Sequence, residues 1–484
     1  MTQIRIVKVN EAKIQIAAEK HVLQELSERF TFDVPNARFS PAFQNRFWDG
    51  KIRLLDGRTN VTYAGLANHI LAYARENNLD IDDQSGITIA QEFSLKEAKD
   101  FIASLNLPME PREYQIKAFV TAIREKRAVL LSPTSSGKSL IAYIIARFYG
   151  VKTLIVVPTV SLVSQMLKDF ESYGYTEKMH GVRAGVKKTT DLDITVSTWQ
   201  SIYEQKESFF KDFGLVIGDE AHLFKAKSLT KVMTNMKNTP YRIGMTGTLD
   251  GAVVHELVLT GLFGSVHRII ETSELIEQGH AAKLRVKILM LKHSKDIARA
   301  LARAKTNYQG EIDYLVESEA RTRFIRNLAL SLSGNTLILC SYVDKHLDVL
   351  YSQIQAKKPS DTYRVSGSTD VDSREEIREI MEKSENATVV ASYGVFSTGV
   401  NVKRIHNIIF ASPSKSRVRV MQSIGRGLRL GEGKTECTLY DIADDLSNGN
   451  KANYTLKHLV ERIKMYTESN FPYKIYTIEI KEKS

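Results

Sequence analysis

From Val129 onward, hydrophobic residues fall into short apolar runs, each followed by a turn and a longer amphipathic stretch. This alternation is typical of parallel strands covered by helices, because a strand buried on both faces is apolar along its length. The runs in the first half are AVLLSPTSSGKS, KTLIVVPT, ITVST, GLVIGDEAH and YRIGMTGT. Each ends in small or polar residues. Since ligands bind outside the carboxyl ends of parallel strands, we expect these ends to line one site.

A second series of the same kind follows residues 271–284, which we interpret as a helix and linker. Its apolar runs are NTLILCSY, DTYRVSG, ATVVASY, HNIIFASP and CTLYDI, with amphipathic stretches such as SREEIREIMEK between them. The first hundred residues differ. There, IRIVKVN and KIQIAA alternate like strands with one exposed face, and HVLQELSERF has helical spacing. The pattern predicts an α/β protein with two similar parallel-sheet lobes and a small N-terminal α+β domain.

The predicted domain boundaries follow from these patterns. We place an N-terminal accessory domain at 1–105, a first lobe at 106–270, a linker at 271–284, and a second lobe with a C-terminal extension at 285–484. A chain of 484 residues exceeds the size at which one core usually stops growing, so more than one domain is expected.

Charge and cysteine content narrow the functional class. The 67 Lys and Arg residues exceed the 56 Asp and Glu residues, which leaves a net charge of +11 and suits a polyanionic partner. Cys340 and Cys437 fit neither a metal-ligand spacing nor a disulfide framework. No apolar run is long enough to span a bilayer or to serve as a signal peptide. We therefore expect a soluble cytoplasmic protein without a membrane partner.

SPTSSGKS, at 132–139, has the context of a phosphate-binding loop, because it follows a strand-like run and precedes the helix-like SLIAYIIARFY. In that geometry backbone N–H groups face the phosphates, Lys138 neutralises the β and γ oxygens, and the Ser139 hydroxyl binds Mg²⁺. Ser132 replaces the first glycine of the general pattern. The residues expected at the nucleotide are Thr134, Ser135, Ser136, Gly137, Lys138 and Ser139.

GLVIGDEAH places two adjacent carboxylates at the end of a buried run. Carboxylates are costly to keep in such a place without a cation. Asp219 is suited to hold Mg²⁺, and Glu220 to orient and deprotonate an attacking water. The alternative is a solvated acidic pair in a loop. His222 carries no assignment, because a lone histidine is often only a polar bridge.

With these motifs in place, the chain resembles a known family. SPTSSGKS, DEAH, TGT and QSIGRGLR, in that order, resemble motifs I, II, III and VI of superfamily 2 helicases across 108–445. The resemblance implies two RecA-like lobes, with ATP and Mg²⁺ as cofactors. It places catalytic residues at Asp219, Glu220, Gln422, Arg426 and Arg429. The two arginines would act as fingers from the second lobe, since a guanidinium stabilises charge developing on the γ-phosphoryl group.

Further motifs carry the resemblance over the rest of the core. PREYQ resembles a Q motif, with Arg112 and Gln115 at the adenine. VVPTVSLVSQ, VSTWQS and ILCSYVDK resemble motifs Ia, Ib and IV, and SYGVFSTGVNVKRIHNIIF resembles motif V. The nucleic-acid contacts implied are Pro158, Thr159, Thr198, Trp199, Ser341 and Thr398. Gly399 and Asn401 are implied at the nucleotide, although many relatives carry an acidic residue where Asn401 stands.

FWDGKIRLLD, DEAH, VASYGVFSTGV, QSIGRGLR and the chain length together are similar to the UvsW type of phage helicase. The resemblance implies a monomeric enzyme of a bacterial or phage-infected cell. Its substrate would be branched DNA or DNA with single-stranded regions, including forks, recombination intermediates and R-loops. RNA in R-loops and recombination or replication proteins are compatible partners.

Aromatic and basic residues alternate around the WDG element, and two interpretations of them stay open. The aromatic rings could stack on unpaired bases while cations such as Arg46 and Lys51 hold phosphates. Alternatively, Phe39, Phe43, Phe47 and Trp48 form the core of a small domain with a solvated basic face. We take Arg46, Trp48 and Lys51 as candidate nucleic-acid contacts.

Two other functional classes compete with a motor. The first is an ATP-switched binding or annealing module, which would not need the catalytic carboxylates and arginines. The second is the translocase part of a nuclease, which would need a metal-binding carboxylate cluster that the sequence does not show outside the motor motifs. An RNA helicase is a variant within the enzyme class, because contacts to sugar and phosphate discriminate poorly.

Overall fold

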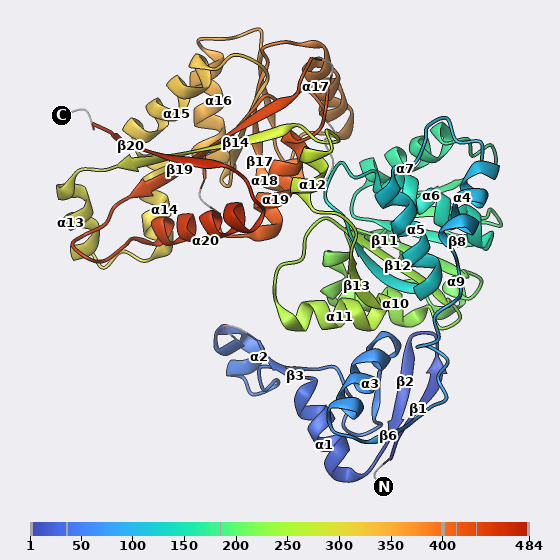
Figure 1. Ribbon diagram of the computed structural model, residues 1–484. Helices are drawn as coiled ribbons and strands as arrows, with labels where there is room; N and C mark the ends of the chain where they lie inside the picture. Colours follow the sequence, from blue (N-terminus) through green and yellow to red (C-terminus); the bar gives the residue numbers. More distant parts are fainter. Residues whose placement is uncertain are drawn as a thin grey trace. The chain divides into compact units, whose positions relative to one another are not determined.

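The computed structural model describes residues 3–34, 37–183, 185–397, 402–412, 414–431 and 433–481, apart from the side chains of 371, 396 and 397. The chain groups into two compact units (Figure 1), Met1–Ser132 with Gly137–Ile269 and Pro133–Ser136 with Ile270–Ser484. Each unit contains a seven-stranded sheet whose paired strands all run parallel. The predicted α/β architecture with two RecA-like lobes is confirmed.

The N-terminal domain is built on a mixed sheet of order β5-β2-β1-β6. Its strands are β1 (Gln3–Asn10), β2 (Lys13–Ala17), β5 (Val61–Tyr63) and β6 (Asp80–Asp83). In β2 and in the first half of β1, alternate residues are buried and exposed, as their sequence pattern predicts. The helical segments are α1 (Lys20–Arg29), α2 (Pro41–Gln44), α3 (Ala67–Glu76), η1 (Ala37–Phe39) and η2 (Ala64–Leu66). A separate two-stranded ribbon pairs β3 (Thr31–Asp33) with β4 (Lys51–Arg53).

The first lobe has the sheet order β13-β7-β12-β11-β8-β10-β9. Its strands are β7 (Arg127–Leu131), β8 (Thr153–Val157), β9 (His180–Val182), β10 (Ile194–Thr198), β11 (Leu215–Asp219), β12 (Tyr241–Thr246) and β13 (Ser265–Arg268). One face is covered by α4 (Leu95–Ser104), α5 (Glu113–Glu125), α6 (Lys138–Tyr149) and α7 (Val160–Ser172). The other face is covered by α8 (Trp199–Ile202), α9 (Glu207–Phe210), η3 (Ala221–Lys225), α10 (Lys227–Asn235) and α11 (Val253–Phe263).

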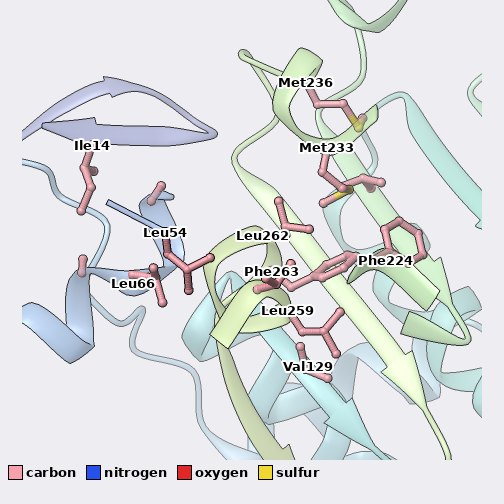
Figure 2. Close-up of a cluster of buried hydrophobic side chains, with 14 of the residues drawn as sticks. Ile14, Leu54, Leu66, Val129, Phe224, Met233, Met236, Leu259, Leu262 and Phe263 are labelled. Atoms are coloured by element: carbon pink, nitrogen blue, oxygen red, sulfur yellow. The ribbon is translucent and has the colours of Figure 1, made fainter. Parts of the chain in front are cut away.

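The N-terminal domain shares a hydrophobic core with the first lobe. Figure 2 shows Leu54 and Leu66 of the N-terminal domain in one cluster with Leu259 and Leu262 of α11. The contact is close enough that a Cβ added to Gly65 would lie 1.9 Å from the carbonyl oxygen of Thr260, which excludes a side chain there. The N-terminal domain is therefore a fixed part of the first unit.

A buried ion pair reinforces that contact. One guanidinium nitrogen of Arg127, at the start of β7, donates to the carboxylate and to the backbone carbonyl of Glu11, both at 2.6 Å. The side chain of Arg127 is 6% exposed and that of Glu11 is 15% exposed. Burial lowers the pKa of Arg127. Its charge is balanced by Glu11.

The second lobe has the sheet order β16-β17-β15-β18-β19-β14-β20. Its strands are β14 (Lys283–Lys292), β15 (Thr336–Cys340), β16 (Thr362–Val365), β17 (Thr388–Ser392), β18 (Asn407–Phe410), β19 (Glu436–Asp445) and β20 (Tyr473–Glu479). The helical segments are α12 (Thr272–Glu277), α13 (Lys295–Arg303), α14 (Tyr308–Glu317), α15 (Glu319–Ser331), η4 (Val343–Leu347), α16 (Asp348–Gln355), α17 (Val371–Lys383), α18 (Tyr393–Ser397), α19 (Arg417–Gly427) and α20 (Tyr454–Glu468).

The structure adds strands that the sequence analysis did not anticipate. These are β9 and β13 in the first lobe and β14 and β20 in the second. β14 is long, with alternating burial along much of its length, and β20 is a largely exposed edge strand. Neither forms the fully apolar run that marks a central parallel strand. Among the described residues, no helix has both the length and the apolar composition needed to cross a membrane.

Candidate active site and nucleic-acid interface

Three strands of the first lobe bring their motifs to one edge of the sheet. β12 lies between β7 and β11, and all three strands are parallel. The segment SPTSSGKS follows β7, the acidic pair ends β11, and TGT begins at the end of β12. The backbone N–H of Ser132 donates to the carbonyl of Thr246 at 2.8 Å, which connects the first loop to the third. The predicted convergence of strand ends is confirmed for these three motifs.

The loop between β7 and α6 has an unusual backbone. Gly137, which precedes α6, has φ +75°, and a Cβ there would lie 2.4 Å from Nε2 of Gln115. Ser135 has φ +73°, which is costly for a residue other than glycine. Such strain is retained when the surrounding structure holds it in place. It supports a loop shaped for close approach of a ligand to its backbone.

The side chain of Gln115 stabilises this loop by joining its backbone to the start of α5. Its Oε1 accepts a hydrogen bond from the backbone N–H of Arg112 at 2.9 Å, and its Nε2 donates to the carbonyl of Gly137 at 3.4 Å. The side chain is buried. PREYQ thus positions the phosphate-loop backbone, a role that the sequence analysis did not assign to it.

The two loop residues with assigned chemistry point toward polar partners. The Lys138 ammonium donates to the carbonyl of Ser132 at 3.3 Å, so it lies across the loop that it would share with phosphate oxygens. The Ser139 hydroxyl lies 2.9 Å from the Tyr173 hydroxyl. Tyr173 follows α7 and has no motif signal in the sequence. Thr134 and Ser136 lie within the loop itself.

Asp219 carries the clearest electrostatic signal of the site. Its Oδ1 is buried and has no hydrogen-bond partner among the described residues. Burial, followed by the adjacent Glu220 carboxylate, raises the pKa of Asp219 to about 6, although Lys138 opposes the shift. An orphaned carboxylate oxygen with a raised pKa marks a place where a cation would be stabilising.

The donor set around Asp219 fits Mg²⁺. The ion prefers oxygen ligands and is usually held by one or two carboxylates together with substrate phosphates. Asp219 and the Ser139 hydroxyl provide such oxygens at the same sheet edge. Among the described residues, no group of three or more His, Cys, Asp or Glu side chains is arranged to hold a metal ion.

Glu220 and His222 are in polar contact with each other beside Asp219. Glu220 has φ +49°, a strained conformation of the kind that clusters at functional sites. Nδ1 of His222 lies 2.9 Å from Oγ1 of Thr246 and 3.3 Å from Oε2 of Glu220. The histidine is buried. It therefore connects the acidic motif to TGT. The sequence alone assigns no such role to His222.

The candidates for nucleic-acid contact in the first lobe lie at two further strand ends. Pro158, a buried residue, and Thr159 follow β8, and the Thr159 hydroxyl accepts from the Leu162 N–H at 3.4 Å as the N-cap of α7. Thr198 ends β10. It is buried, and its hydroxyl lies 2.9 Å from that of Ser201. Trp199, the first residue of α8, is half-buried.

In the second unit, α19 carries Gln422 and Arg426, and Arg429 follows its C-terminal end. Lys434, which the sequence analysis missed, caps this end. Its ammonium donates to the carbonyls of Gly427 at 2.5 Å and Arg429 at 2.8 Å. Burial lowers the pKa of Lys434 to about 8. A cation at the C-terminus of a helix satisfies its free carbonyls and is favoured by the helix dipole.

Ser341, the candidate in motif IV, follows β15 and is exposed, and its backbone N–H donates to Oγ of Ser412 at 3.0 Å. The candidates Thr398, Gly399 and Asn401 lie outside the described residues.

The N-terminal aromatic residues are not a core. Phe39 is 65% exposed, Phe43 37% and Phe47 86%. The interpretation of these rings as a hydrophobic core is therefore wrong. We call residues 37–53 the N-terminal tip. Its helix α2 extends away from the four-stranded sheet (Figure 1), and the guanidinium of Arg38 lies over the Phe39 ring at 4.9 Å.

The three candidate contacts lie in the same tip. Arg46 has φ +58° and is exposed. The indole N–H of Trp48 donates to the carbonyl of Lys51 at 2.8 Å, which holds the half-buried ring near the start of β4. Lys51 is exposed, with its ammonium 4.0 Å from the carboxylate of Asp33.

Comparisons with known proteins agree with this geometry. Residues 3–82 match the family "DNA helicase UvsW, N-terminal", 108–251 match "Type III restriction enzyme, res subunit", and 319–431 match "Helicase conserved C-terminal domain". The chain is 31% identical to the ATP-dependent DNA helicase uvsW of Enterobacteria phage T4, covering 96% of this chain and 98% of that protein. It is 27% identical to the DNA 3'-5' translocase XPB2 of Sulfurisphaera tokodaii, covering 70% of this chain and 84% of that protein.

A solved structure supports the same assignment. The crystal structure of T4 UvsW aligns with a TM-score of 0.52 at 27% identity, covering 99% of each chain. The similarity to the phage T4 protein thus extends over the N-terminal domain and both lobes. The chain belongs to the UvsW-type family of superfamily 2 ATP-dependent DNA helicases.

Proposed function

We propose that this helicase remodels branched DNA, with ATP hydrolysed at the first lobe and arginines supplied by the second. The observation that carries the branched-DNA part is the N-terminal tip. Its exposed phenylalanines lie among the cations Arg38, Arg46 and Lys51, so it offers stacking surfaces beside phosphate-binding charges. Exposed aromatic rings are costly in water, and unpaired bases at a branch point are a chemically matched partner.

The chemistry that we assign to the first lobe divides between five side chains. Lys138 holds the β- and γ-phosphates, while Ser139 and Asp219 would hold Mg²⁺, which neutralises phosphate charge when bound. Glu220 takes a proton from the attacking water. His222 orients Glu220 through the contact that also reaches Thr246.

Arg426 and Arg429 complete the proposed cycle. A finger arginine contributes about 10³-fold or more to phosphoryl transfer. Hydrolysis would therefore depend on the two units coming together around the nucleotide, and ATP turnover would be coupled to movement. Gln422, on the same face of α19 as Arg426 at a spacing of one helical turn, is proposed to assist in the same site.

Motifs Ia, Ib, IV and V are proposed to hold the DNA backbone. Pro158, Thr159, Thr198, Trp199, Ser341 and Thr398 are the residues that we assign to this track. Because Thr159 is the N-cap residue of α7, the N-terminal backbone N–H groups of that helix would bind phosphate together with its side chain, and Thr198 precedes α8 in the corresponding position.

The test compares ATP-dependent remodelling of a fork, a four-way junction, an R-loop and a blunt duplex. We expect turnover on the branched substrates and little on the duplex. Glu220→Gln should bind each substrate and remodel none. Phe47→Ala should lose activity on branched DNA while keeping ATPase activity on single-stranded DNA, whereas Tyr473→Ala, an exposed aromatic on β20, serves as the matched control. Equal activity of Phe47→Ala and wild type on every substrate would contradict the role of the tip.

A further inference from the structure

A second candidate binding site lies entirely within the second lobe. The cavity has a volume of about 550 Å³, within the range of sites that bind small ligands. It opens beside Ser341 and Tyr342, which follow β15, and beside Ala411 and Ser412, which follow β18. β15 and β18 are neighbours in the sheet.

The order of strands in the second sheet explains why a cavity lies at this position. After β15 the chain builds β16 and β17 on one side of β15, and β18 then pairs on its other side. The carboxyl ends of β15 and β18 therefore flank a topological switch point, which is where open parallel sheets bind ligands. The cavity lies at the place where this fold would be expected to hold a ligand.

Buried donors hold one wall of the cavity in place. The backbone carbonyls of Ala411, Ser412 and Ser414 accept hydrogen bonds from Arg321 at 2.8 Å, Tyr393 at 3.1 Å and Arg462 at 3.1 Å, respectively. Arg321 and Arg462 are each 1% exposed and are paired with Asp444 and Asp441. A wall supported by two buried ion pairs is preformed, so a ligand would not have to order it.

One residue of the cavity lining is a buried histidine. His346 is 1% exposed and belongs to the cavity lining. Its Nδ1 lies 3.1 Å from Oγ of Ser412, which accepts from the Ser341 N–H. Its Nε2 has no hydrogen-bond partner among the described residues. Burial, followed by Arg321, lowers the pKa of His346 to about 3, so the ring is neutral.

The mouth of the cavity combines aromatic rings with positive charge. Tyr308 and Tyr454 line it and are 38% and 42% exposed, and their rings make an edge-to-face contact with centroids 6.1 Å apart and an interplanar angle of 75°. Lys415 and Arg419 are exposed lining residues, and the described residues that line the cavity include no Asp or Glu. The buried Glu311 carboxylate accepts from the backbone N–H groups of Tyr454 and Thr455 at 2.9 and 2.7 Å, which fixes the start of α20 and with it Tyr454.

We propose that this cavity binds one unstacked nucleotide of a DNA strand, with the base stacked on the exposed ring of Tyr454 and the phosphate at Lys415 and Arg419. The inference rests on the proposed function, because Ser341 at its rim belongs to the assigned DNA track. The π face of a base stacks on the exposed ring of Tyr454, and Tyr308, in edge-to-face contact with Tyr454, flanks that ring. Bases of an intact duplex are held in the stack, so the cavity selects unpaired strands.

Photo-crosslinking tests the location. A single-stranded oligonucleotide carrying 5-iodouracil is irradiated with the full-length protein, and the crosslinked peptides are identified by mass spectrometry. Crosslinks to peptides containing Tyr308, Tyr342 or Tyr454 are expected. Crosslinks found only elsewhere, from a protein that binds the oligonucleotide and hydrolyses ATP, would overturn the proposal. Competition of the crosslink by dTMP as effective as by unlabelled oligonucleotide would reassign the cavity to free nucleotides and overturn it as well.

Affinity measurements test the contribution of stacking. Tyr454→Ala should weaken binding of single-stranded DNA by about 5- to 100-fold, while Tyr454→Phe should stay within about twofold of wild type. Tyr473→Ala, at 41% exposure on β20, is the matched control and should not change affinity. Affinity for a blunt duplex should be unchanged in all three variants.

The outcomes separate this proposal from the proposed function. If wild type neither binds single-stranded DNA nor hydrolyses ATP on it, the proposed function fails. If wild type does both and Tyr454→Ala behaves like Tyr473→Ala, only the cavity proposal fails. Equal weakening of single-stranded and duplex binding by Tyr454→Ala would also overturn it, because a site for an unstacked nucleotide does not act on a stacked helix.

Discussion

Replacing Asp219 by Asn should make the nucleotide-free protein more stable while abolishing its ATPase activity. Burial and Glu220 raise the pKa of Asp219 from 3.8 to about 6. At about 1.36 kcal/mol per pKa unit, ionising this carboxyl in the folded protein costs about 3 kcal/mol, which partial exposure of the residue reduces to about 2 kcal/mol. Asn has the same shape without the charge. For a unit of this size the gain corresponds to roughly 4–8 °C in Tm.

The stabilising effect of Asp219→Asn should depend on pH. Because the pKa of Asp219 is raised in the folded state, its favourable contribution is complete below pH 3.8 and is lost as pH rises through about 6. The difference in free energy of unfolding between Asp219→Asn and wild type should therefore be small near pH 4. It should increase between pH 4 and 6 and remain constant from there to pH 8. Thermal unfolding of both proteins across this pH range, without nucleotide, measures it.

Asp444→Asn is the matched control. Burial alone would raise the pKa of Asp444, but Arg321 and His293 more than offset it and lower the pKa. Removing that charge leaves Arg321 buried and unpaired, so this variant should lose stability at pH 8. Addition of Mg²⁺ and ATP should stabilise wild type more than Asp219→Asn. An Asp219→Asn protein that is no more stable than wild type at pH 8, or whose gain does not depend on pH, would refute the reasoning.

Four other outcomes are expected. Lys138→Ala should lose ATPase activity but keep DNA binding, because phosphate binding and strand binding use different surfaces; full turnover in an ATPase assay would contradict its role. Arg426→Ala should bind ATP normally, measured with a fluorescent nucleotide, and hydrolyse it about 10³-fold more slowly; lost affinity with normal turnover of bound ATP would exclude a finger. DNA affinity should fall steeply with salt and depend little on sequence, whereas a flat titration would rule out phosphate-dominated binding. Glu11→Ala should destabilise the first unit by about 3 kcal/mol in denaturant unfolding, because Arg127 would be buried without its partner; unchanged stability would show that the pair contributes nothing.

The central strands and their motifs could be predicted from the sequence. A strand buried on both faces must be apolar along its length, and so β7, β8, β10, β11 and β12 were all identified, as were β15 to β19. The edge and near-edge strands β9, β13, β14 and β20 were not, because partial exposure breaks that pattern. The motif order was enough to identify the family, since each motif combines a residue type with a fixed place at a strand end.

The individual contacts of the site depended on tertiary structure. Nothing near Lys434 in the sequence indicates that it caps α19, because the carbonyls it binds are brought to it by the fold. The link from His222 to Thr246 joins residues that follow different strands, and Tyr173, which follows α7, contacts Ser139. Composition equally could not decide whether the N-terminal phenylalanines were core or surface, since an aromatic ring suits both places.

The sequence by itself thus determined the lobes and the family and predicted the chemistry of the nucleotide site, because apolar periodicity and the spacing within a motif are properties of neighbouring residues. The tertiary structure alone decided which side chains are exposed, which cations cap or pair with which groups, and where the second lobe leaves a preformed cavity. Those features require residues far apart in the chain to meet, and pairings of that kind leave no local pattern.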